Sequence, residues 1–176
     1  MTEIVMNNAV LIGGMMALVW LVSIPLRDVS IIDLVWGLGF VLVAWKTAWL
    51  FNDWSFAAPS RPLLLGMTTL WGLRLTSHLA MRNIGHGEDK RYAAMRCARP
   101  QTFWWQSLLL VFGLQAGVMW LISLPLQFGI AQPTPGWHWQ HVLGLLFWAM
   151  GLFFEAVGDW QLMRFKQNPA NRGQVL

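Results

Sequence analysis

The sequence predicts an all-α integral membrane protein, and its composition is the first reason. Of the 176 residues, 56% are hydrophobic and only 11% are charged, whereas a soluble domain carries about 25% charged residues. The chain has 13 Trp and 10 Phe but one Tyr, which is typical of side chains packed in lipid and at its edges. This composition leaves too little polar surface for most soluble folds, and it excludes disordered and coiled-coil proteins.

Five apolar segments account for most of the chain, and each is long enough for a helix that crosses the hydrocarbon in about 20 residues. They lie at about residues 4–26, 29–51, 62–81, 103–128 and 138–162. The first and fourth contain no charged residue. The second contains Asp33 and Lys46, the third Arg74 and His78, and the fifth Glu155 and Asp159. We expect the five helices to form one transmembrane domain over residues 1–176.

The connections between these segments predict the orientation. Lys and Arg follow the first, third and fifth segments, whereas the loop at 129–137 carries no charge. Short basic loops stay in the cytoplasm, so the N-terminus is expected outside and Leu176 inside. The net charge of +4 is then explained by topology, and we expect no nucleic-acid partner. A single cysteine, Cys97, excludes an intrachain disulfide and a multi-cysteine metal site; no metal site is predicted.

Charged residues inside the spans are the first candidates for function, because each costs a few kcal/mol to insert. In the predicted orientation Asp33, Arg74, His78, Glu155 and Asp159 all lie in the cytoplasmic halves of their helices. This common depth predicts a polar pocket that opens to the cytoplasm.

Helical spacing groups these residues into two stripes. Arg74, His78 and Arg82 are four residues apart and share one face of a helix. Glu155, Asp159 and Lys166 form a second stripe, roughly 16 Å long at 1.5 Å per residue. Two acids and a cation in one line could hold an extended polar ligand, and cations favour phosphate.

The loop at 82–100 is the most basic part of the chain. Glu88 and Asp89 stand where the first turn of a short helix favours acids, and Tyr92, Arg96 and Arg99 would share a face of that helix. A basic helix at the membrane surface can bind anionic lipid or a soluble phosphate ligand.

Structural explanations stay open for several of these features. Asp33 follows Ser30 at a capping-box spacing, and Arg74 and His78 could pair with an acid of another helix. The basic loop could be a positive-inside anchor only. Lys46 is expected to extend outward to the membrane surface.

Three motifs carry a resemblance to a known family. They are SIIDLVWG at 30–37, LWGLRL at 70–75 with His78 and with GEDKRY at 87–92, and FFEAVGDWQ at 153–161 followed by Phe165 and Lys166. Together they resemble a bacterial family of uncharacterised membrane proteins grouped with the steroid 5-alpha-reductases. The resemblance extends over nearly the whole chain.

The resemblance implies a seven-helix fold in a bacterial inner membrane, of which this chain is the N-terminal five helices without the C-terminal ones. It also implies a reductase that takes NADPH from the cytoplasm and reduces a carbon–carbon double bond conjugated to a ketone, in a lipophilic substrate from the bilayer. Membrane lipids would be its other partners. The implied cofactor-binding residues are Arg74, Glu155, Asp159, Lys166 and Arg96.

The catalytic residues depart from the reductase pattern. Reductases of known activity use a Glu–Tyr pair on the second and third helices, where this chain offers Asp33 and Trp71, and its single tyrosine, Tyr92, lies in a loop. The predicted catalytic residues are therefore Asp33 and His78, with Arg74 as a further possible donor to the ketone oxygen. Two alternatives remain: a membrane methyltransferase of the isoprenylcysteine or phospholipid type that uses S-adenosylmethionine, and a non-enzymatic membrane scaffold or lipid-binding protein.

Overall fold

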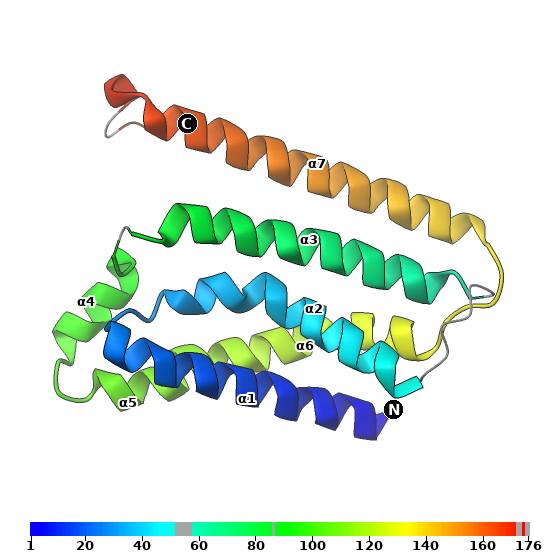
Figure 1. Ribbon diagram of the computed structural model, residues 1–176, viewed down its shortest axis with the longest axis horizontal. Coiled ribbons are helices and arrows are strands. Elements are labelled where there is room, and N and C mark those ends of the chain that lie inside the picture. The colour runs from blue at the N-terminus through cyan, green and yellow to red at the C-terminus, as the bar shows by residue number, and fades with distance from the viewer. Residues whose placement is uncertain (52–57, 86, 172–173, 175–176) are drawn as a thin grey trace. The chain divides into compact units, whose positions relative to one another are not determined.

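The computed structural model describes residues 1–51, 58–85, 87–171 and 174, and every regular element in these ranges is helical (Figure 1). In chain order they are α1 (Thr2–Leu26), α2 (Ile31–Phe51), α3 (Ser60–Asn83), α4 (Lys90–Ala98), α5 (Phe103–Ser107), the π-helical stretch η1 (Leu108–Gly113), α6 (Leu114–Ala131), α7 (Trp139–Gln167) and the 3₁₀ turn η2 (Pro169–Asn171). The predicted all-α class is confirmed.

A helix forms over each of the five predicted spans, with ends that differ by a few residues. Four helical stretches are long and apolar enough to cross a membrane: Thr2–Leu26, Ile31–Phe51, Phe103–Ala131 and Trp139–Gln167. The third predicted span, inside α3, is not among these four, because Arg61, Arg74, His78 and Arg82 lower the hydropathy of that helix. The long apolar helices fit a membrane protein, whereas the number of five spans is not confirmed.

The chain divides into two compact units, Met1–Gly136 and Trp137–Leu176, where the sequence predicted one domain. The second unit consists of α7 and η2, and α7 has no fully buried residue. Leu176, which was predicted to lie in the cytoplasm, is outside the described residues.

Within the first unit, α2 packs against α1, α3 and α6, and these helices run alongside one another (Figure 1). The core between them contains Ile12 and Met16 of α1, Phe40 and Val43 of α2, and Met119 of α6. Burying such side chains fully stabilises a soluble fold by about 1.5–3 kcal/mol each; within lipid, close packing takes over that role.

The closest approach in this unit joins the backbones of α2 and α3. A Cβ atom built on Gly37 would lie 2.2 Å from the Gly72 carbonyl oxygen, and one on Gly72 would lie 2.6 Å from the Gly37 carbonyl oxygen. Glycine at both positions therefore lets the helices touch, as small residues do at helix interfaces in membranes. This contact fixes α2 against α3 one turn from Asp33.

Polar side chains join α1, α2 and α6 at the other end of the unit. The fully buried Asn8 amide donates to Thr47 Oγ1 (2.8 Å) and to Gln127 Oε1 (3.0 Å). Lys46, which was expected to extend outward, is half-buried, and its Nζ donates to the Asn7 carbonyl oxygen at 2.6 Å. Its extension to the membrane surface stays a prediction, and α1 supplies a backbone acceptor for the ammonium group.

Candidate functional site

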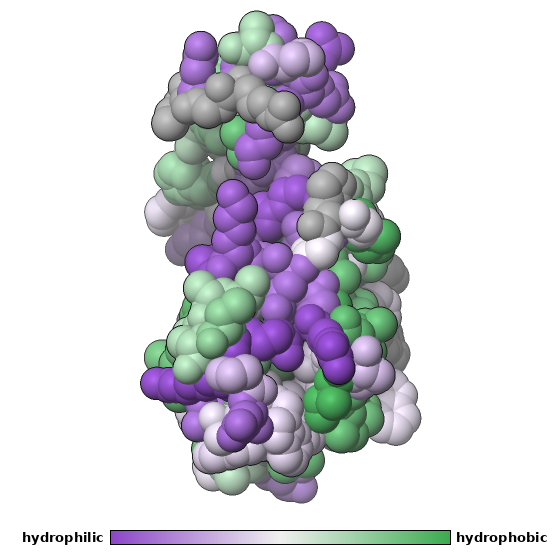
Figure 2. All heavy atoms as spheres, turned by 90° about the vertical axis from the view of Figure 1, so that its left-hand side faces the viewer, coloured by the Kyte–Doolittle hydropathy of each residue, from purple (hydrophilic) through white to green (hydrophobic). Residues whose placement is uncertain are grey.

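One end of the first unit is strongly basic. Figure 2 shows hydrophilic side chains gathered over α4 and the neighbouring helix ends. The cations that the chain places in this region are Arg27, Arg82, Lys90, Arg91, Arg96 and Arg99. They outnumber the acids there, which are Asp28, Asp33, Glu88 and Asp89. Such an end favours anionic ligands.

A hollow of about 310 Å³ opens at this end. It is lined by Asp33 and Trp36 of α2, by Leu75, Leu79 and Arg82 of α3, and by Gln115 of α6. Asp33 is half-buried, and the cations that act on it are Arg91 and Arg82. The hollow thus combines an apolar wall with one carboxylate and a cationic rim.

Tyr92, the only tyrosine in the chain, interacts with two residues that line the hollow, Gln115 and Asp33. It lies on α4, only 9% of its surface is exposed, and the Gln115 side chain is within hydrogen-bonding reach of its hydroxyl. Burial, and next the negative charge of Asp33, raise the pKa of the Tyr92 hydroxyl above its ordinary value. The hydroxyl therefore stays protonated at neutral pH and can donate a hydrogen bond.

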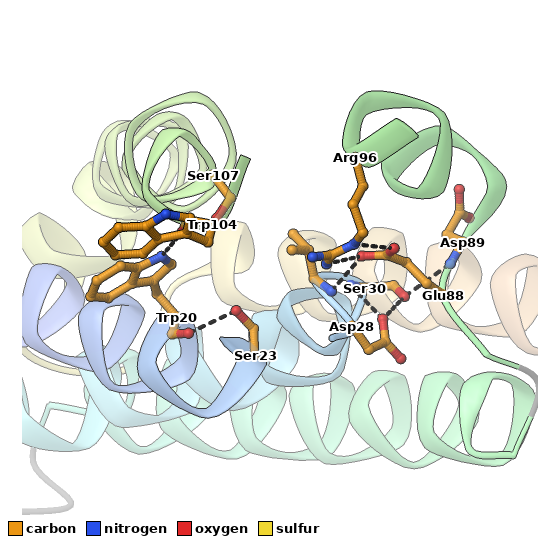
Figure 3. A network of polar contacts seen from close by, with 10 residues as sticks. Trp20, Ser23, Asp28, Ser30, Glu88, Asp89, Arg96, Trp104 and Ser107 are labelled. Atoms are coloured by element: carbon orange, nitrogen blue, oxygen red, sulfur yellow. Dashed lines mark hydrogen bonds and ion pairs between the residues drawn. The ribbon is translucent and has the colours of Figure 1, made fainter. Parts of the chain in front are cut away.

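A small network of hydrogen bonds holds α4 in place; Figure 3 shows Glu88, Asp89 and Arg96 beside Ser30. Glu88 Oε1 accepts from the Val29 amide (2.9 Å) and from Arg96 Nη2 (2.7 Å), and Glu88 Oε2 accepts from Arg96 Nε (2.9 Å). The Asp89 amide donates to Ser30 Oγ at 3.0 Å. We call this set, Val29, Ser30, Glu88, Asp89 and Arg96, the α4 latch. It ties α4, and with it Tyr92, to the turn between α1 and α2.

Two expectations for this region are wrong. Ser30 Oγ accepts from Asp89 and donates to Asp28, so Ser30 does not form a capping box with Asp33. Arg99 follows the end of α4, with φ of −139°, so it does not continue the helical face of Tyr92 and Arg96. The predicted short helix itself is confirmed, with Asp89 as its N-cap: the Asp89 carboxylate accepts from the Arg91 amide at 2.9 Å.

The α4 latch should make stability depend on pH. Partial burial raises the pKa of Glu88, but the hydrogen bonds from Arg96 and Val29 outweigh it and hold that pKa below its ordinary value, which is about 4.3. A carboxyl group with a lowered folded pKa stabilises the fold above its unfolded pKa, and this stabilisation is lost as pH falls through the folded pKa.

We expect Glu88→Gln to lower the free energy of unfolding by about 1–2 kcal/mol at pH 7. Between pH 5 and about pH 3 the stability of this variant should fall less than that of the parent, because Gln cannot be protonated in this range. Thermal unfolding in detergent at several pH values measures both effects, with Glu3→Gln, remote from the latch, as the control. Equal pH dependence of Glu88→Gln and the parent would contradict the role of the latch.

The structure brings together only some of the residues that the sequence singled out. Arg74 and His78 lie on α3 but do not line the hollow, which uses Leu75, Leu79 and Arg82 of that helix. Arg96 is bound to Glu88 within the α4 latch.

The second stripe lies in the other unit. Glu155 and Asp159 are half-buried and Lys166 is exposed, all on α7. A single pocket formed by this stripe and the hollow stays a prediction. Among the described residues, no group of three or more His, Cys, Asp or Glu side chains is placed to hold a metal ion.

Sequence reasoning missed Tyr92 and Gln115 as members of the site. The helical spacing of Tyr92 and Arg96 predicted a shared face of α4. The sequence did not show that this face is turned toward the other helices, because the α4 latch determines the orientation of α4. Gln115 has no signal in the sequence beyond its polarity within an apolar span.

Comparison with known proteins gives one match. A family model described as "Protein of unknown function (DUF1295)" matches residues 19–176. No curated protein and no solved structure matches the chain. The matched range includes the hollow, the α4 latch and the acids of α7.

Proposed function

The chain belongs to the DUF1295 family of proteins of unknown function, and we propose that it is a membrane oxidoreductase that uses NADPH to reduce the conjugated double bond of a lipophilic enone. The observation that carries this proposal is the buried, protonated Tyr92 hydroxyl, which is hydrogen-bonded to Gln115 and lies within electrostatic range of Asp33. Gln115 and Asp33 both line a hollow with apolar walls at the basic end of the first unit. The steroid 5-alpha-reductase resemblance supports the reaction type.

The residues of the hollow suit the polar half of this reaction. NADPH, when bound, would supply the hydride that adds to the β-carbon of the enone. Tyr92 donates a hydrogen bond to the ketone oxygen and stabilises the negative charge that develops there. Gln115 is hydrogen-bonded to the hydroxyl and orients it, and Leu75 and Leu79 contact the apolar body of the substrate. A proton from solvent water adds to the α-carbon, so that hydride and proton together saturate the double bond before the ketone is released.

Cations near the hollow suit the phosphates of the cofactor. Arg82 lines the hollow and is exposed, and its Nε donates to Asn83 Oδ1 at 2.9 Å, which leaves its terminal nitrogens for an anion. Arg74, Glu155, Asp159 and Lys166 are the further proposed cofactor ligands. In this proposal Arg96 positions α4, because Glu88 already binds its guanidinium group.

The proposed orientation follows from the same charges. The basic end of the first unit faces the cytoplasm of a bacterium, where NADPH is available, and the N-terminus lies outside. His78, on the face of α3 next to the hollow, is the second candidate for the proton donor.

Cofactor binding by the full-length protein tests the proposal. We expect Glu155→Ala and Asp159→Ala each to weaken NADPH binding by about 1–3 kcal/mol, the range for a lost hydrogen bond to a charged group, while stability in detergent changes less. Glu3→Ala, at the start of α1, is the control.

Fluorescence titration of the protein in lipid nanodiscs measures the binding affinity for NADPH and, separately, for S-adenosylmethionine. Binding of S-adenosylmethionine without NADPH would reject the proposal in favour of a methyltransferase. If both variants bind NADPH like the parent but unfold much earlier, the two acids are structural.

A further inference from the structure

A second concave site lies at the opposite end of α2. It is a groove of about 430 Å³ between α1 and α2, lined by Leu11 of α1 and by Leu42, Trp45, Lys46 and Trp49 of α2. Lys46 follows Asp33 by 13 residues on the same helix, which is about 20 Å at 1.5 Å per residue. The groove is therefore separate from the proposed catalytic hollow, and what it binds is a separate question.

The walls of the groove are apolar, and a hydrogen bond holds one of the wall residues, Trp45, in place. Trp49 is 72% and Trp45 47% exposed, and the Trp45 indole Nε1 donates to Thr69 Oγ1 of α3 at 2.9 Å. Tryptophan is enriched where the hydrocarbon meets the headgroups. Trp49 lies one turn beyond Lys46 toward the helix end, whereas Leu42 lies one turn deeper, so the groove runs from the interface into the hydrocarbon.

Among the described residues that line this groove, Lys46 alone is charged. Its ammonium group has three N–H donors, of which one reaches the Asn7 carbonyl oxygen. No described carboxylate forms an ion pair with it. The side chain is half-buried, so its charge is held at the wall of the groove. A cation above an apolar channel is complementary to a molecule with an anionic head and an apolar tail.

We propose that this groove binds one anionic phospholipid, with its phosphate at the Lys46 ammonium group and one acyl chain along Leu42 and Leu11. Trp49 would then lie at the level of the headgroup. Lysine binds phosphate as a point charge, and the acyl chain explains why the rest of the lining is apolar.

Lipid retention measured by native mass spectrometry tests this site. The full-length protein is titrated with phosphatidylglycerol and, separately, with phosphatidylcholine. We expect the parent to prefer phosphatidylglycerol, and Lys46→Met to lose that preference by about tenfold or more, as expected for a lost charge-assisted hydrogen bond. Lys46→Arg, which keeps the charge, should keep the preference, and so should Lys90→Met at the basic end.

A second variant tests the groove without removing the charge. Leu42→Trp fills the channel while Lys46 stays in place, and we expect it to reduce phosphatidylglycerol retention as well. Unchanged retention by Lys46→Met, equal retention of both lipids by the parent, or equal binding of glycerol 3-phosphate without acyl chains would each overturn the proposal.

Discussion

Gly37→Ala is expected to destabilise the protein by about 3 kcal/mol or more, at the upper end of the range for overpacking a core. The added Cβ atom would lie 2.2 Å from the Gly72 carbonyl oxygen and 2.9 Å from Thr76 Oγ1. The nearest of these atoms belongs to the backbone, so no side-chain rotation relieves the clash. The helices α2 and α3 must separate, and the hollow that both line should change shape with them.

Gly66, a glycine of α3 away from this contact, provides the matched control. Gly66 has no heavy atom within 4 Å of the position that its Cβ would take, so Gly66→Ala should leave stability unchanged or raise it slightly through helix propensity. Thermal unfolding in detergent and the monodisperse fraction on size exclusion compare the two variants. Equal stability of Gly37→Ala and Gly66→Ala would show that the close approach is not required.

Tyr92→Phe is expected to reduce the turnover of NADPH-dependent enone reduction by about 10²–10³-fold, the effect of removing one donor to a developing oxyanion. The substitution deletes only the hydroxyl and keeps the buried ring, so NADPH affinity and thermal stability should change little. Because the pKa of Tyr92 lies above its ordinary value, which is about 10, loss of its proton should not reduce the rate of the parent at any pH below that.

His78→Ala distinguishes the two candidate donors. If Tyr92 donates to the ketone, His78→Ala retains most of the turnover that Tyr92→Phe loses. The reverse result would assign the role to His78, and Tyr92 would then be a packing residue of α4. Steady-state NADPH oxidation, followed at 340 nm with an enone substrate in nanodiscs, measures both variants.

The sequence was sufficient to predict the helices because length and apolar content largely determine them in a membrane. It could not predict the environment of Tyr92, since the contact that orients α4 joins Glu88 to Val29, which are 59 residues apart. The sequence could not predict the hydrogen-bond partner of Lys46 either, because the Asn7 carbonyl that accepts from its ammonium group lies on another helix. The π-helical stretch Leu108–Gly113 has no marker in its apolar sequence.

The α4 latch also sets an order for biosynthesis. Val29 and Ser30 leave the ribosome 59 residues before their partners Glu88 and Asp89, a delay of about 3–12 s at 5–20 residues per second. During that interval the first helical hairpin is made but its turn has no partner, so the Val29 amide must be hydrated at the membrane surface. The latch closes only after α3 has been synthesised, and Tyr92 reaches Asp33 at that step. In a Cys97→Ser background, a nascent chain halted before Glu88 should therefore leave this turn accessible to water-soluble thiol reagents through a cysteine placed at Val29, and a longer one should protect it.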